Sequence, residues 1–157
     1  MLGLFHFRKE TERLTTLRQL PLFATLSGPE LRVVDGLLHE RRFLKGEIIF
    51  DEGEEGQTVY VIIAGRVLIC RQGEPETGRI AEIDAGVVFG ELALLDDAPR
   101  SAQARAAEDC VLASLSRGDF ESLLDTHAVT ASKIALQLAR QLGRQLREHS
   151  ASIARRV

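Results

Sequence analysis

The spacing of apolar residues predicts two helices at the start of the chain. Residues 8–20 carry leucines at helical spacing among charged residues, and Pro21 ends this helix. Ser27 is predicted to cap a second helix, because Pro29 lies in the first turn and Glu30 stands three residues after the cap. The apolar face of this second helix consists of Leu31, Val34, Leu37 and Leu38.

After residue 40 the pattern changes to short runs of β-branched residues separated by glycines. Strands are predicted at 48–50, 59–63, 67–69, 80–83, 87–89 and 103–115. Glycines at positions 46, 53, 56, 65 and 73 mark turns that need a positive φ or a close approach between strands. Residues 73–79 are predicted to form a polar hairpin tip. This pattern is typical of an antiparallel β-sandwich.

The end of the chain is predicted to be helical again. Ser116 and Asp119 cap a helix over 117–125, and 128–156 forms one long helix. An apolar stripe recurs every four residues on it, at Ile134, Leu138, Leu142 and Leu146. The opposite face carries Lys133, Gln137, Arg140, Gln141, Arg144 and Arg147. The stripe either packs on the chain's own strands or pairs with the same helix of a second copy.

Composition narrows the class of protein. The chain has 157 residues, 45% of them hydrophobic, and a net charge of −3, which predicts one domain with a buried core and no general affinity for nucleic acid. The basic residues near the C-terminus are therefore interpreted as a solvated helix face. No apolar run approaches the ~20 residues that cross a bilayer. The apolar residues 2–7 follow no basic region, so they are not a signal peptide, and they are long enough only to touch a surface or partner.

Cysteines and histidines offer no catalytic or metal-binding pattern. Cys70 and Cys110 fall in predicted strands, which favours buried, reduced thiols in a cytoplasmic protein. The histidines are far apart and form no HxH or HExxH motif, which argues against a metal-dependent cupin. No nucleophile–base pair is recognisable either, so the chain is not predicted to be an enzyme or to hold a metal. The four histidines are His6, His39, His127 and His149.

The segment 89–102, with the sequence FGELALLDDAPRSA, carries the candidate chemistry. Gly90 and the amides after it can open a helical turn whose free N–H groups face an anion. Arg100 offers a planar fork to a phosphodiester. Glu91 can accept a hydrogen bond from a ribose hydroxyl. Taken alone, the same residues are also compatible with an amphipathic helical turn, a proline turn and a surface arginine.

FGELALL followed by APRSA resembles the phosphate-binding cassette of cyclic nucleotide-binding domains. This family includes the catabolite activator protein, the regulatory subunits of protein kinase A and the cyclic nucleotide-gated channels. The glycine spacing at 46, 53, 56 and 65 is similar to that of the family's β-roll. The resemblance implies an α+β fold, an antiparallel, jelly-roll-like β-roll (a double-stranded β-helix). Its expected parts are an N-terminal helical segment (1–39), a roll (40–116) with the cassette (89–102), and C-terminal lid or dimerisation helices (117–157).

The resemblance also implies a ligand site for cAMP or cGMP, without a further cofactor. Its members are Gly90, Glu91, Leu92, Ala93, Arg100, Ser101 and Ala102. Glu91 takes the ribose 2′-hydroxyl, Arg100 the phosphate, and Ser101 with Ala102 supplies a hydroxyl and an N–H. Bacterial cAMP receptors carry serine after the arginine, which favours cAMP. A lid over the base comes from the last helix, with Arg140, Gln141 and Arg144 as candidates by position, although a solvated charged face explains them equally well.

Two carboxylates, Asp96 and Asp97, are out of place beside an anion site. In the family this part of the cassette is a solvent-facing turn of variable composition, so both are predicted to be exposed. Inward-pointing carboxylates would weaken ligand binding.

The function implied is a stand-alone cyclic nucleotide sensor. Ligand binding favours one arrangement of the flanking helices, and a downstream effector protein that the sequence does not identify receives the signal. We expect a homodimer through the C-terminal helix, no DNA-binding module before the chain ends at Val157, and no transmembrane segment. The alternative is a structural or docking module that kept the roll and lost its ligand. That alternative predicts a broken cassette, whereas Gly90, Glu91 and Arg100 are all present.

Overall fold

The computed structural model describes residues 12–155, and its first helices follow the predicted capping signals. Residues 12–19 are helical, while the predicted start at residue 8 lies outside the described residues. A 3-10 turn, η1 (Pro21–Phe23), follows. Helix α2 (Gly28–Leu37) begins after Ser27, and the Ser27 N–H donates to Glu30 Oε1 at 3.0 Å while the Ser27 hydroxyl accepts from the Glu30 N–H. The predicted cap is therefore confirmed.

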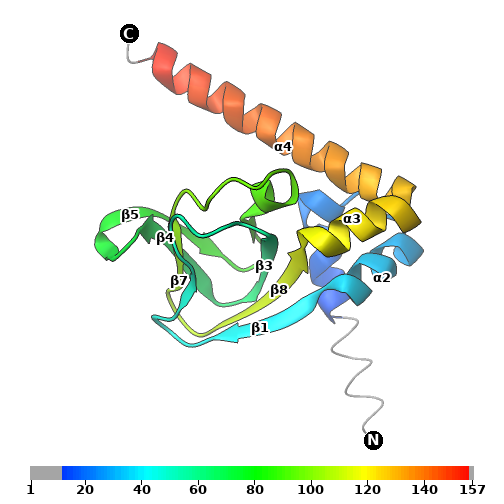
Figure 1. The fold of residues 1–157 in the computed structure, drawn as a ribbon, viewed down its shortest axis with the longest axis horizontal. Helices are drawn as coiled ribbons and strands as arrows, with labels where there is room; N and C mark the ends of the chain where they lie inside the picture. The colour runs from blue at the N-terminus through cyan, green and yellow to red at the C-terminus, as the bar shows by residue number, and fades with distance from the viewer. Residues whose placement is uncertain (1–11, 156–157) are drawn as a thin grey trace, which may run out of the picture.

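The strands of the described chain form two four-stranded antiparallel sheets (Figure 1). The first has the order β1-β8-β3-β6 and the second the order β2-β7-β4-β5. Their bounds are β1 (His39–Phe43), β2 (Ile48–Phe50), β3 (Thr58–Ala64), β4 (Arg66–Arg71), β5 (Glu74–Asp84), β6 (Val88–Phe89), β7 (Gln103–Ala106) and β8 (Cys110–Ser116). The predicted α+β fold with an antiparallel β-roll is confirmed.

The single strand predicted over 103–115 is wrong, because β7 and β8 belong to different sheets. The residues between them contain neither glycine nor proline, and the polar pair Glu108 and Asp109 is the only local signal of a turn. Tertiary contacts hold this turn instead: the Ala107 N–H donates to the Arg66 carbonyl at 2.9 Å, and the Lys45 N–H donates to Asp109 Oδ1 at 2.8 Å.

The polar hairpin tip after β4 is shorter than predicted. Glu74 already pairs with Arg71, and Arg79 pairs with Cys70, so the residues between Glu74 and Arg79 form a bulge. Strand β5 therefore begins inside the segment predicted to be the tip.

Side chains alternate along β3 between two apolar cores. Val59 and Val61 face a core shared with the helices, whereas Ile62 faces the interior of the roll. Strand β8 alternates in the same way, with Leu115 against the helices and Leu112 inside the roll. Because both faces of these strands are buried, their sequences are apolar at nearly every position.

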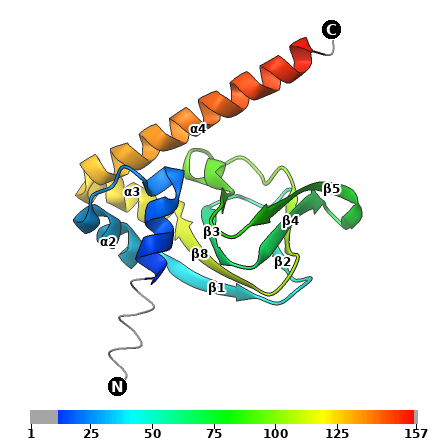
Figure 2. The same cartoon turned by 180° about the vertical axis from the view of Figure 1, so that it is seen from behind.

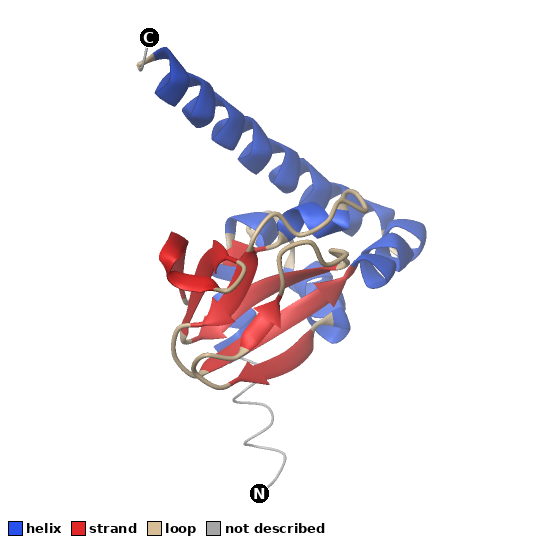
Figure 3. Cartoon of the chain, turned by 60° about the vertical axis from the view of Figure 1, so that its left-hand side comes forward, coloured by secondary structure: helices blue, strands red, loops and turns tan. Residues whose placement is uncertain are grey.

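Helices α3 (Arg117–Thr126) and α4 (Ala128–Ala154) complete the chain. Ser116 caps α3, since its hydroxyl accepts from the Asp119 N–H at 3.0 Å. The first half of α4 packs on the chain's own core through Ile134 and Leu138, whereas Leu146 is 68% exposed. The second half extends beyond the roll (Figures 1 and 2), and the helices gather at one end of the sheets (Figure 3).

Candidate functional site

All seven residues of the predicted ligand site line one cavity of about 380 Å³, within the range of small-molecule sites. They are Gly90, Glu91, Leu92, Ala93, Arg100, Ser101 and Ala102. Phe50 of β2 and Ile69 of β4 contribute apolar surface, and Gln145 of α4 lies at the same cavity. The cassette, the roll and the last helix therefore meet at this one place.

Gly90 begins the cassette in a conformation that only glycine adopts readily. Its φ is +72°, and it precedes a 3-10 turn, η2 (Glu91–Leu94), which is the helical turn that the sequence predicted. A Cβ atom at Gly90 would lie 2.7 Å from Arg100 Nη1. The positive φ therefore favours glycine, and any side chain here would displace the Arg100 guanidinium.

The Arg100 guanidinium lies over the floor of the cavity. Its Nη2 donates to the Thr58 carbonyl at 2.6 Å and its Nη1 to the Gly90 carbonyl at 3.3 Å. The guanidinium carbon lies 4.1 Å from the centre of the Phe50 ring. Gly56 leaves room for this side chain, because a Cβ atom there would lie 3.2 Å from Arg100 Nε.

Arg100 is a half-buried cation whose charge is only partly compensated. Burial lowers its pKa, while Tyr60 and Glu54 raise that pKa. Within residues 12–155 no ion pair joins Arg100 to a carboxylate, and its buried Nε has no hydrogen-bond partner. Carbonyl oxygens and aromatic faces offset part of the charge. A bound anion would supply the missing partner.

Glu91 contacts the last helix. Its Oε1 accepts a hydrogen bond from Gln141 Nε2 at 3.0 Å. The carboxylate that the sequence assigns to the ribose is therefore held by one of the three lid candidates. Gln141 therefore contacts a residue of the cavity lining without lining the cavity itself.

The other two lid candidates, Arg140 and Arg144, are exposed and do not line the cavity. Gln145, which sequence reasoning missed, lines it together with the cassette. The reason is helical geometry: residues four apart share a face, so Gln145 follows Gln141, whereas each arginine is rotated by about 100° from its neighbouring glutamine.

Two further arginines at the cassette were also missed. Arg71 of β4 donates to the Ser101 carbonyl at 3.1 Å and pairs with Glu52 at 2.9 Å. Arg117, the first residue of α3, pairs with Asp97, which is 79% exposed. Asp97 and Asp96 are exposed as predicted, although Asp96 lies at the edge of the cavity.

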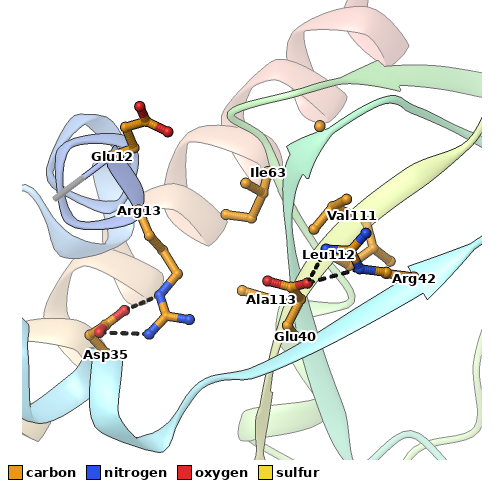
Figure 4. Close-up of a pocket in the computed structure, with 10 residues that line it drawn as sticks. Glu12, Arg13, Asp35, Glu40, Arg42, Ile63, Val111, Leu112 and Ala113 are labelled. Atoms are coloured by element: carbon orange, nitrogen blue, oxygen red, sulfur yellow. Dashed lines mark hydrogen bonds and ion pairs between the residues drawn. The ribbon is translucent and has the colours of Figure 1, made fainter. Parts of the chain in front are cut away.

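A second cavity, of about 560 Å³, lies between residues 12–19, α2 and the outer face of the first sheet (Figure 4). Its charged residues pair with one another: Arg13 Nη2 donates to Asp35 Oδ2 at 2.8 Å, and Arg42 Nη2 lies 2.8 Å from Glu40 Oε1. None of the cassette residues lines it. This cavity therefore offers no unpaired charge of the kind found at Arg100.

The described part of the chain shows neither a recognisable metal site nor a membrane-spanning helix. No group of three or more His, Cys, Asp or Glu side chains there could hold a metal ion. None of the helices described is long and apolar enough to span a bilayer. Cys70 and Cys110 are buried and free, as predicted, and burial raises the pKa of both thiols.

Comparison with known proteins identifies relatives of this chain. The Cyclic AMP receptor protein of Thermus thermophilus is 35% identical over 125 residues, covering 78% of this chain and 57% of that protein. A cAMP-dependent protein kinase regulatory subunit of Hypocrea atroviridis is 32% identical over 108 residues, covering 69% of this chain and 22% of that protein. The chain thus spans about half of the first relative and a smaller part of the second.

A solved structure agrees in fold. The cyclic nucleotide-binding domain from Methylobacillus flagellatus superposes with a TM-score of 0.77 at 25% identity, covering 96% of this chain and 85% of that one. The model of the cyclic nucleotide-binding domain matches residues 40–127, more than half of the chain, and it describes a binding domain and not a catalytic one. The chain belongs to the cyclic nucleotide-binding domain family.

Proposed function

We propose that this chain is a sensor domain that binds a cyclic nucleotide, with cAMP preferred over cGMP, in the cavity at the cassette. The observation that carries the proposal is Arg100, a half-buried guanidinium whose buried Nε has no partner and which forms no ion pair within the described residues. A phosphodiester keeps one negative charge at neutral pH, and it matches the guanidinium fork.

Each predicted residue takes one part of the ligand. Arg100 binds the phosphate together with the amides of Glu91 and Leu92, which open η2. Glu91 accepts from the ribose 2′-hydroxyl, which selects ribose over deoxyribose. Ser101 and Ala102 supply a hydroxyl and an N–H at the other end of the cassette.

Gln145 extends the proposal to the base. A glutamine amide presents one donor and one acceptor, a pair that matches the N6 and N7 positions of adenine. Guanine presents two acceptors at the corresponding edge. This match, the serine at position 101 and the cAMP-related names of the relatives all support cAMP.

The contact between Glu91 and Gln141 supplies a route for the signal. A ribose hydroxyl at Glu91 shares the carboxylate with Gln141, so occupancy changes how α4 is held. A ligand shifts an equilibrium between two helix positions by its difference in affinity for them. The exposed Leu146 on the extended half of α4 supports pairing with a second copy, and the free buried thiols support a cytoplasmic location.

Isothermal titration with cAMP and with cGMP tests the proposal. Wild-type protein is expected to bind in the micromolar range or tighter, and Arg100→Ala to lose about two to three decades, because removing one partner of a desolvated charged pair costs roughly 2–5 kcal/mol. The matched control is Arg32→Gln, which removes an exposed positive charge on α2. Equal binding by wild type and Arg100→Ala contradicts the assignment. Binding of neither nucleotide favours the docking-module alternative.

A further inference from the structure

Arg117 reaches four acceptors that belong to three different segments around the cassette. Its Nε donates to the Ala93 carbonyl at 2.7 Å, and its Nη2 donates to the Gly56 carbonyl at 2.7 Å. The same guanidinium contacts the Asp96 carbonyl and the Asp97 carboxylate. The side chain is 14% exposed, so these contacts are largely shielded from water.

A cation at this position is unfavourable for the helix itself. Arg117 is the first residue of α3, and the N-terminus of a helix carries partial positive charge that favours anions. An ion pair with the exposed Asp97 contributes too little stability to explain why an arginine occupies the start of α3. The convergence of three main-chain carbonyls on one guanidinium explains it better, because such an arrangement holds loops in a defined shape.

Arg117 and Arg100 hold the same short segment, residues 56–58. The Gly56 carbonyl accepts from the Arg117 side chain, and the Gln57 carbonyl accepts from the Arg117 N–H at 2.8 Å. The Thr58 carbonyl accepts from Arg100 at 2.6 Å. Gly56 also packs against Arg100, with too little room for a Cβ atom. A shift of Arg117 is therefore transmitted to Arg100 through three consecutive residues.

Two carboxylates beside the cassette are negative charges that could compete with an anionic ligand for Arg100. Asp96 lines the cavity, and Asp97 follows it directly. Arg117 holds the main chain of Asp96 and the side chain of Asp97, while the Asp96 carboxylate accepts from the Ala98 N–H at 3.2 Å, so both carboxylates are held by contacts other than Arg100. A carboxylate that turned toward Arg100 would pair with its guanidinium and occupy the place of an anionic ligand.

We infer that Arg117 is a positioning residue for the anion site: it keeps Asp96 and Asp97 away from Arg100, and so leaves the Arg100 guanidinium free for a ligand phosphate. The inference rests on the proposed function and concerns the same cavity. Arg117 itself touches no ligand; it acts through the turn and through Gly56.

Titration calorimetry with cAMP on the full chain tests the inference with Arg117→Gln. The variant is expected to bind about tenfold more weakly, which corresponds to about 1.4 kcal/mol. The loss is expected to shrink in high salt, because ions screen the freed carboxylates. Arg32→Gln removes the same charge at a remote exposed site and is expected to bind within about twofold of wild type.

Neutralising the carboxylates separates positioning from a general loss of structure. Adding Asp96→Asn and Asp97→Asn to Arg117→Gln is expected to restore binding to within about threefold of wild type. If Arg117→Gln does not fold, Arg117→Lys takes its place, because an ammonium keeps the charge but cannot reach all four acceptors. Arg117→Lys is expected to lose less affinity for cAMP, and the same two asparagines are expected to restore that affinity.

The outcomes distinguish the two proposals. If wild type binds and the Arg117 variant binds equally well, the inference is wrong and the proposed function stands. If the loss persists undiminished after both asparagines are introduced, Arg117 acts only as a structural residue and the inference is again wrong. If wild type binds neither cAMP nor cGMP, the proposed function fails and the inference fails with it.

Discussion

Gln141 of α4 donates a hydrogen bond to the carboxylate of Glu91, 50 positions earlier in the chain, at 3.0 Å. This contact joins the cassette to the helix that extends beyond the roll. Glu91 is the first residue of η2 and lines the cavity. Any change in the contacts of its carboxylate therefore alters the cavity lining. The helix and the candidate ligand site are therefore in direct contact.

Removing this contact should loosen α4. We expect Gln141→Ala, without ligand, to speed amide hydrogen exchange in α4 after residue 140, because the second half of the helix has few other buried contacts. Exchange in α2, whose hydrogen bonds to α4 come from Thr130 and Lys133 before residue 140, serves as the internal control. Unchanged exchange in α4 would show that the hydrogen bond does not restrain the helix.

Glu91 should distinguish ribose from deoxyribose. Hydrogen bonds to charged groups contribute about 1.5–3 kcal/mol, so Glu91→Ala should weaken cAMP binding by about ten- to a hundredfold. The same variant should bind 2′-deoxy-cAMP almost as wild type does, since that ligand lacks the hydroxyl. Calorimetry with both ligands measures how far the effect of Glu91→Ala depends on the 2′-hydroxyl of the ligand. An equal loss for both would contradict the assigned role.

Gly90 can be tested for its close approach to Arg100. Gly90→Ala places a Cβ atom 2.7 Å from Arg100 Nη1 at a φ of +72°, so the arginine must move and cAMP binding should fall by at least about tenfold. Gly46→Ala is the matched control: its φ is +87°, but no atom lies within 4 Å of the added methyl. Both variants should lose about 1–2 kcal/mol of stability from the left-handed backbone, measured by urea unfolding. Only Gly90→Ala should lose binding; a similar loss in both would assign the effect to backbone strain.

Glu30 should make the free energy of unfolding depend on pH in the acid range. Hydrogen bonds from Lys133 and then Ser27 lower its pKa from 4.5 to about 2, and Thr130 adds a smaller contribution. A carboxyl whose pKa is lowered by folding stabilises the folded chain above its unfolded pKa, and that contribution is lost as pH falls toward 2. Urea unfolding of wild type and Glu30→Gln should therefore differ at pH 7 and converge near pH 2. A difference that is the same at both pH values would contradict this role.

Part of the candidate site follows from local sequence alone. The cassette is contiguous, and its turn depends on a glycine that can adopt positive φ, so Gly90 and the residues after it could be placed without knowledge of the rest of the chain. Ser27 and Ser116 were recognisable for the same reason, because a cap is formed by residues within one turn.

Other features were out of reach because they depend on residues distant in sequence. The break between β7 and β8 is held by Arg66 and Lys45, and the broken segment signals it only through the polar pair Glu108 and Asp109. Helical spacing showed that α4 has an apolar and a polar face but left the orientation of the polar face toward the cavity undefined. Packing of Ile134 and Leu138 sets that orientation, and it turns Gln141 and Gln145 toward the cassette.

The sequence by itself determined the identity of the cassette, the capped helices and the alternation of strands and glycine turns, since each depends on backbone geometry or periodicity over a few residues. The roles of the charged side chains, by contrast, were decided only by the tertiary structure. Arg100 is a half-buried cation that forms no ion pair within the described residues, and Arg117 holds the main chain of Asp96 and the carboxylate of Asp97 beside the same cavity. Both facts depend on burial and on partners brought together by folding, because the strength and direction of an electrostatic interaction are set by the surroundings of a charge and not by its place in the chain.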